Sequence, residues 1–136
     1  MLLKKLKILL IDEDETEVLK LNRAISENFD DYEITVAHKS SDALSILENS
    51  FIDIILLDLN IKNINGIEFI SKVKSYSKLK HIPIIILTRS NKVEVIEKCY
   101  KLGIAGYVLK SLKQEDYEMK INSILQYWSL NEFILK

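Results

Sequence analysis

Four polar side chains each follow a short apolar run at widely separated places in the chain: Asp12, Asp58, Thr88 and Lys110. Such runs are typical of strands in a parallel sheet, where both faces are covered. Because the carboxyl ends of parallel strands share one edge, where ligands bind, we expect these side chains to meet. Carboxylates gathered there would repel one another and bind protons or a cation, while a lysine and a hydroxyl would bind an anionic group.

The acidic group extends beyond one residue, because Glu13 and Asp14 follow Asp12 directly. Carboxylate oxygens without neighbouring His or Cys favour a hard ion, so Mg²⁺ is the expected occupant. An aspartate beside such a cation can act as a nucleophile toward phosphorus and form an acyl phosphate. We therefore predict phosphoryl transfer to Asp58, with Mg²⁺, Lys110 and Thr88 binding the oxygens of the transferred group.

Five apolar segments alternate with five segments of helical periodicity, which predicts an α/β fold with a parallel sheet, helices on both faces and right-handed crossovers. The expected strands cover residues 7–11, 33–37, 52–60 with 54–57 as its unbroken apolar part, 82–88 and 106–110. The first expected helix begins at Asp14 or Thr16 and ends near Asn28, the second begins at Ser41, and the third covers 67–76. The fourth runs from Ser90 or Asn91 to Leu102, before Gly103, and the fifth runs from about Lys113 to about Trp128.

A chain of 136 residues with 48% hydrophobic residues is expected to form one domain, 1–136, with 126–136 as a short C-terminal extension. The formal net charge of −1 gives no electrostatic reason to expect nucleic acid or an anionic membrane as a partner. Cys99 is the single cysteine, so no intramolecular disulfide is expected. Lysines interrupt the apolar residues of 1–11, which indicates neither a signal segment nor a membrane span, and we expect a cytoplasmic protein.

The order of these motifs resembles the CheY-like receiver domain of two-component response regulators. The motifs that carry the resemblance are Ile8-Leu9-Leu10-Ile11-Asp12-Glu13, Leu56-Leu57-Asp58-Leu59-Asn60 with Asn65-Gly66, Ile86-Leu87-Thr88 and Gly106-Tyr107-Val108-Leu109-Lys110. The resemblance spans residues 7 to about 125 and implies a flavodoxin-like (βα)5 fold with sheet order 2-1-3-4-5. A narrower similarity, carried by Tyr127-Trp128, is to small stand-alone regulators that partner phytochrome-type sensor kinases.

The resemblance implies that Asp58 accepts a phosphoryl group from a sensor histidine kinase or a phosphotransfer protein. Thr88 and Lys110 would bind that group, and Thr88 with Tyr107 would form the switch that changes a protein-binding surface for a downstream protein target. Such a protein is a signalling receiver rather than an enzyme, because it catalyses only its own phosphorylation and dephosphorylation. The implied ligands of Mg²⁺ are Asp12, Glu13, Asp58 and the backbone carbonyl of Asn60.

Three positions depart from the family pattern. Glu13 stands where the family usually has a second Asp, and Lys62 stands where the loop after the acceptor commonly has Pro. Ser111 follows the lysine, where the family usually has a Pro that is often cis. Because a non-proline cis bond costs about 3 to 4 kcal/mol, a trans bond is expected between Lys110 and Ser111.

Other interpretations of the same residues remain open. The chain could be an unphosphorylated receiver fold that serves as a protein-interaction module, which Glu13 and Ser111 favour. A metal-dependent phosphatase is disfavoured because Asn60 stands where a second Asp would follow Asp58. Tyr107 fits a core or edge position nearly as well as a switch. The apolar C-terminal cluster would either dock on the domain or be exposed for a partner or a homodimer; its members are Leu125, Tyr127, Trp128, Leu130, Phe133, Ile134 and Leu135.

Overall fold

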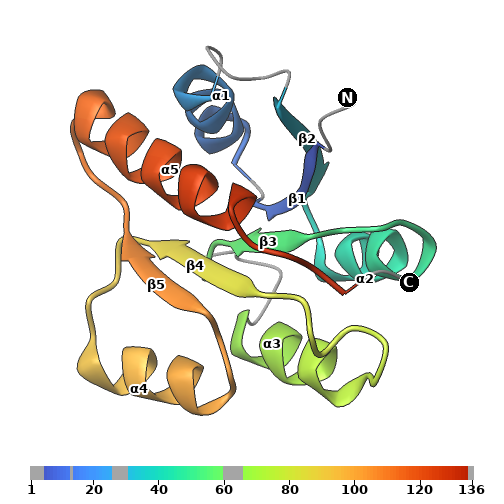
Figure 1. Ribbon diagram of the computed structural model, residues 1–136. Coiled ribbons are helices and arrows are strands. Elements are labelled where there is room, and N and C mark those ends of the chain that lie inside the picture. The colour runs from blue at the N-terminus through green and yellow to red at the C-terminus, as the bar shows by residue number, and fades with distance from the viewer. Residues whose placement is uncertain (1–4, 13, 26–30, 60–65, 135–136) are drawn as a thin grey trace.

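The computed structural model describes residues 5–12, 14–25, 31–59 and 66–134, and Figure 1 shows a central sheet with helices on both sides. Each neighbouring pair of strands is parallel, and the order across the sheet is β2-β1-β3-β4-β5. The predicted flavodoxin-like order is therefore confirmed. The strands are β1 (Leu6–Ile11), β2 (Tyr32–Ala37), β3 (Ile54–Leu57), β4 (Ile84–Thr88) and β5 (Gly106–Leu109).

Five helices cover the two faces of the sheet in the part of the chain that the structure describes. Residues of α1 and α5 are buried together with one face, and residues of α2, α3 and α4 are buried together with the other. Figure 1 shows the same division into three layers. The helices are α1 (Glu15–Ala24), α2 (Ser40–Asn49), α3 (Gly66–Ser75), α4 (Val93–Lys101) and α5 (Gln114–Ser129).

Strand β3 is the centre of the sheet and is covered on both faces. Its four residues are fully buried. Successive side chains of a strand point to opposite faces, and accordingly Ile54 and Leu56 pack with the α1–α5 side while Ile55 and Leu57 pack with the other. This double burial explains why the strand is apolar without alternation, and it places Asp58 at the middle of the sheet's carboxyl edge.

A helix start differs from the sequence predictions, and one predicted helix end lies outside the described residues. Helix α1 is described to Ala24 with Ile25 as its C-cap, whereas its predicted end near Asn28 falls outside the described residues. Helix α2 begins at Ser40 with Lys39 as the N-cap, rather than at Ser41. The helix starts where the extended backbone of Lys39 ends, and the Lys39 side chain forms no capping hydrogen bond. The prediction was wrong because it relied on the preference for a serine side chain as the cap.

Helix α4, unlike α2, begins later than predicted, but it ends as expected. Its N-cap is Lys92, again with an extended backbone and no side-chain cap, instead of Ser90 or Asn91. Gly103 follows the helix with φ of 99°, which confirms it as the left-handed residue past the end. An added Cβ at Gly103 would meet only carbons of the Lys74 side chain, so the conformation rather than the space calls for glycine.

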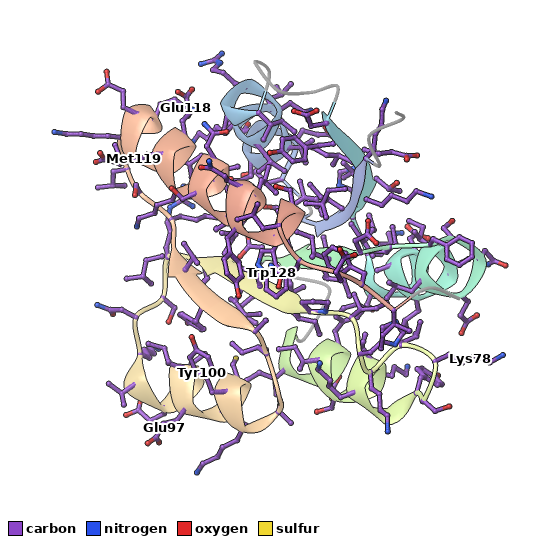
Figure 2. All side chains as sticks on the ribbon, viewed as in Figure 1. Lys78, Glu97, Tyr100, Glu118, Met119 and Trp128 are labelled. Atoms are coloured by element: carbon purple, nitrogen blue, oxygen red, sulfur yellow. The ribbon has the colours of Figure 1, made fainter. Side chains whose placement is uncertain are left out.

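The C-terminal apolar cluster divides between the two predicted outcomes. Leu125 is fully buried, and Trp128 and Phe133 pack partly buried against the same core, with ring centroids 6.4 Å apart. Figure 2 shows Trp128 near the end of α5, beside the sheet. Tyr127 and Leu130 are exposed. Within the described ranges, no helix is long and apolar enough to cross a membrane.

Candidate functional site

The ammonium of Lys110 lies among three carboxylates at the carboxyl edge of the sheet. Its Nζ is 3.1 Å from Asp58 Oδ2, 3.3 Å from Asp12 Oδ2 and 3.4 Å from Glu17 Oε2. The first two contacts are hydrogen bonds that Lys110 donates. The Lys110 side chain is only 3% exposed. Residues 12, 58 and 110 therefore meet as the strand-end argument predicts, although they are far apart in the sequence.

The backbone of the sheet positions these side chains. The pairing of the strands continues one residue past their ends, because the Asp58 N–H donates to Ile11 O at 3.1 Å and the Lys110 N–H donates to Thr88 O at 2.8 Å. Likewise, the Asp12 N–H donates to Ala37 O at 3.1 Å. The functional side chains thus start from backbone that the sheet holds rigidly, which is how a precise site is built.

Burial and charge act in opposite directions on the carboxyl group of Asp12. Burial raises its pKa above the ordinary value, and the nearby charge of Asp58 adds to that increase. The Asp14 N–H, which donates to Asp12 Oδ1 at 3.0 Å, and the Lys110 ammonium lower the pKa but do not fully compensate. Asp12 is therefore a carboxylate that would gain from additional positive charge.

Lys110 shows the opposite balance. Burial would lower the pKa of its ammonium, but Asp12, Asp58 and Glu17 outweigh burial and raise that pKa above its ordinary value. The side chain therefore carries its proton throughout the neutral range. A permanently charged ammonium in a nearly buried position is suited to binding an anionic group next to Asp58.

Sequence reasoning missed two members of this cluster, Glu17 and Arg89. Glu17 lies on α1 with its side chain 7% exposed, and Arg89 Nη2 donates a 2.8 Å hydrogen bond to Glu17 Oε1. Burial opposes ionisation of Glu17, but Lys110, Arg89 and Lys20 together lower its pKa. The spacing of Glu17 from Leu21, four residues on, could have revealed it, because both fall on the buried face of one helix.

Thr88 and Tyr107 both contact the backbone of Ser90. Thr88 is fully buried at the end of β4, and its Oγ1 accepts a 3.4 Å hydrogen bond from the Ser90 N–H. The Tyr107 hydroxyl donates to Ser90 O at 2.7 Å, and its partly buried ring packs against the α2–α3–α4 side of the core. The predicted switch residues, Thr88 at the end of β4 and Tyr107 in β5, therefore both hydrogen-bond to Ser90 in the short segment between β4 and α4. The tyrosine ring also forms part of the boundary of the core.

Whether a magnesium ion fits the site depends on which side-chain atoms are available as its ligands. The carboxylates of Asp12 and Asp58 meet at Lys110, and the pKa of Asp12 stays raised despite that ammonium. Their ligand atoms are carboxylate oxygens, the type that Mg²⁺ prefers, and the fit is therefore favourable. The other two predicted ligands, Glu13 and Asn60, lie outside the described residues, and within the described ranges no group of three or more metal-ligating residues occurs.

Further expectations concern single residues. The Lys110–Ser111 peptide bond is trans, as predicted, and Lys62 lies outside the described residues. Cys99 is fully buried in the core. The His38 side chain is partly exposed and contacts the site's backbone, since its Nδ1 lies 2.8 Å from Asp12 O.

Comparison with known proteins places the chain among signalling domains. The family described as "Response regulator receiver domain" matches residues 8–122. The two-component response regulator-like protein APRR1 of Arabidopsis thaliana is 29% identical over 127 residues, which are 92% of this chain and 19% of that protein. The chain thus spans about a fifth of that relative's length. The chemotaxis protein CheY-3 of Vibrio cholerae is 25% identical over 90% of this chain and 94% of its own length.

Solved structures with the same fold include two response regulators. The phosphorylated cyanobacterial phytochrome response regulator RcpA matches with a TM-score of 0.88 at 24% identity, covering 96% of this chain and 99% of that one. The Mn²⁺-bound form of the response regulator Rcp1 matches with a TM-score of 0.84 at 25% identity, with the same coverage. Both comparisons support the fold that the strand order shows.

Proposed function

The chain belongs to the response regulator receiver domain family, and we propose that it accepts a phosphoryl group on Asp58 from a sensor histidine kinase or a phosphotransfer protein. The observation that carries the proposal is the contact of Asp58 with the buried ammonium of Lys110, beside the second carboxylate of Asp12. RcpA, which shares the fold, was solved in a phosphorylated form. The proposed output is a changed surface for a downstream protein, rather than turnover of a substrate.

The chemistry follows from the arrangement around Asp58. A carboxylate oxygen of Asp58 forms a bond to phosphorus while the bond between phosphorus and the donor histidine nitrogen breaks, and that nitrogen keeps the bonding electron pair. Lys110, which already donates a 3.1 Å hydrogen bond to Asp58 Oδ2, binds a phosphoryl oxygen as negative charge moves onto the phosphoryl group. Thr88, fully buried at the end of β4, is the proposed hydroxyl partner of the same group.

A divalent cation is the proposed cofactor, held by Asp12 and Asp58, with Glu13 and the Asn60 carbonyl as further ligands. When bound, it would neutralise charge on the phosphoryl oxygens. The meeting of the Asp12 and Asp58 carboxylates at one place, with the pKa of Asp12 still raised beside Lys110, supports this proposal. The Mn²⁺-bound form of Rcp1 supports a divalent ion in this fold, and Mg²⁺ is the ion that we propose for this chain.

The proposed switch acts through Ser90. Binding of the phosphoryl group by Thr88 would disturb the Ser90 N–H bond, and Tyr107 is bonded to the carbonyl of the same residue. A change at Asp58 would therefore reach the segment before α4 and the neighbouring surface of α4, β5 and α5 as a shift between two populations. Figure 1 shows these three elements next to one another at one side of the molecule.

Phosphorylation of the purified protein tests the proposal directly. The protein would be incubated with Mg²⁺ and phosphoramidate or acetyl phosphate, and its intact mass would be measured. We expect one added phosphoryl group that hydroxylamine removes, as it does an acyl phosphate, and no addition to Asp58→Asn. An unmodified wild type, or equal modification of the variant, would contradict the proposal and favour the alternative of an unphosphorylated interaction module.

A further inference from the structure

Glu17 and Arg89 form an ion pair that joins α1 to the segment after β4. Arg89 Nη2 donates a 2.8 Å hydrogen bond to Glu17 Oε1, and Lys20 Nζ lies 3.9 Å from the same oxygen. The Glu17 side chain is 7% exposed, whereas the Arg89 side chain is 52% exposed. A buried carboxylate at the site is thus hydrogen-bonded to a cation that lies half in solvent.

The other oxygen of Glu17 faces the lysine of the site. Glu17 Oε2 lies 3.4 Å from Lys110 Nζ, the longest of the three carboxylate contacts, while Lys110 donates hydrogen bonds to Asp12 and Asp58. An ammonium group has three donors, and the hydrogen bonds to Asp12 and Asp58 use two of them. If Glu17 drew closer, it would take the third donor, for which a phosphoryl oxygen beside Asp58 competes.

Arg89 controls how strongly Glu17 competes. A buried charge that loses its hydrogen-bonded partner must find another or be protonated, because burial of an unpaired carboxylate is costly. If Arg89 is removed, Lys110 at 3.4 Å is closer to Glu17 than Lys20 at 3.9 Å. The Glu17 carboxylate would then move onto Lys110 and draw the ammonium away from Asp58.

We propose that Arg89 is a positioning residue that holds Glu17 away from Lys110 and so keeps the ammonium free for Asp58 and the phosphoryl group. Its kinetic consequence rests on the proposed function of Asp58, but the placement of Lys110 in the unphosphorylated protein does not. The role also explains why an arginine stands next to buried Thr88, since an apolar side chain there would leave Glu17 without its hydrogen bond.

The kinetic experiment compares Arg89→Ala, Glu17→Gln and the double variant with wild type, using phosphoramidate and Mg²⁺ and measuring the initial rate of phosphorylation. We expect Arg89→Ala to slow the reaction about tenfold, a factor that corresponds to ~1.4 kcal/mol and is near the value of one hydrogen bond to a charged group. Glu17→Gln alone should be faster than wild type, and the double variant should recover most of the lost rate. Arg89→Lys should recover part of it.

Lys92→Ala is the matched control, because it removes an exposed positive charge from the same segment. It should leave the rate unchanged. A slow Arg89→Ala that Glu17→Gln does not rescue would overturn the proposal, because Arg89 would then act directly on the phosphodonor or on folding. An unchanged rate in Arg89→Ala would overturn it as well. If Arg89→Ala fails to fold, Arg89→Gln takes its place and keeps a hydrogen-bond donor without the charge.

A second readout separates this proposal from the proposed function. The ¹⁵N resonance of the Lys110 ammonium would be recorded by NMR in metal-free, unphosphorylated protein. We expect it to shift in Arg89→Ala and to return toward its wild-type position in the double variant. If wild type is never phosphorylated, the proposed function fails, yet the resonance still decides this inference: a reversed shift supports it, and an unmoved resonance refutes it.

Discussion

Replacing Lys110 by Met removes the charge at the centre of the cluster while keeping a side chain of similar length. Lys110 donates hydrogen bonds to Asp12 and Asp58 and pairs with Glu17, with its side chain 3% exposed. Two charge-assisted hydrogen bonds of roughly 1.5–3 kcal/mol each would be lost. Breaking a buried ion pair costs about 3–5 kcal/mol, because the partner charges stay buried without compensation. We expect the free energy of unfolding at pH 7 to fall by about 3–5 kcal/mol.

The pH dependence identifies the cause of that loss. Without the ammonium, the pKa values of Asp12 and Glu17 rise, so the folded variant takes up protons as the pH falls from 7 toward 5 and is stabilised relative to its unfolded chain. In the wild-type protein the pKa of Glu17 is lowered by folding, so its ionised carboxylate stabilises the folded state at pH values above the unfolded-state pKa. This stabilisation is lost as the pH falls through the folded-state pKa. The difference between variant and wild type should therefore shrink on acidification.

Urea unfolding followed by the fluorescence of Trp128, the single tryptophan, measures both quantities. Lys78→Met is the control, because Lys78 is exposed and points away from the sheet (Figure 2). Its effect should be within about 0.5 kcal/mol at both pH values. A loss in Lys110→Met that is equally large at pH 5 would mean that packing rather than charge is responsible, and no loss at all would refute the description of a buried ion cluster.

Three further substitutions test other features of the fold. Tyr107→Phe removes the 2.7 Å bond to Ser90 O, so we expect a loss of about 0.5–1.5 kcal/mol and faster amide hydrogen exchange before α4, whereas Tyr100→Phe, on an exposed side chain, should change neither. Gly103→Ala places a Cβ at φ of 99° and should cost about 1–2 kcal/mol in urea unfolding, and a neutral result would contradict the conformational explanation. Leu125→Ala opens a cavity at a fully buried position and should cost about 2–5 kcal/mol, while Leu130→Ala, at an exposed position, should be nearly neutral; equal losses would show that the tail packs differently.

The sequence was sufficient to predict the parallel sheet and the meeting of Asp12, Asp58 and Lys110. Their proximity depends only on strand direction, because parallel strands end at one edge regardless of how far apart they lie in the chain. The central position of β3 was equally predictable from its apolar sequence, because a strand that is buried on both faces shows no polar alternation.

Glu17 and Arg89 were missed because each has an ordinary explanation when taken alone. An acid in the first turn of a helix suits the helix dipole, and an arginine after a strand is usually solvated. Their pairing depends on how α1 packs beside the end of β4, which no local pattern encodes. The starts of α2 and α4 were misplaced for a related reason: side-chain preferences predicted caps, whereas extended backbone at Lys39 and Lys92 decided them.

Residues 88–90 have one further consequence for motion. Thr88 O accepts the backbone N–H of Lys110, Arg89 pairs with α1, and Ser90 O accepts the hydroxyl of Tyr107, so three consecutive residues are fixed to neighbouring elements. Helix α4 begins at Val93. Any rigid rotation of α4 while these bonds persist must therefore pivot within residues 91–92, a hinge only two residues long that limits the helix to swinging about one end.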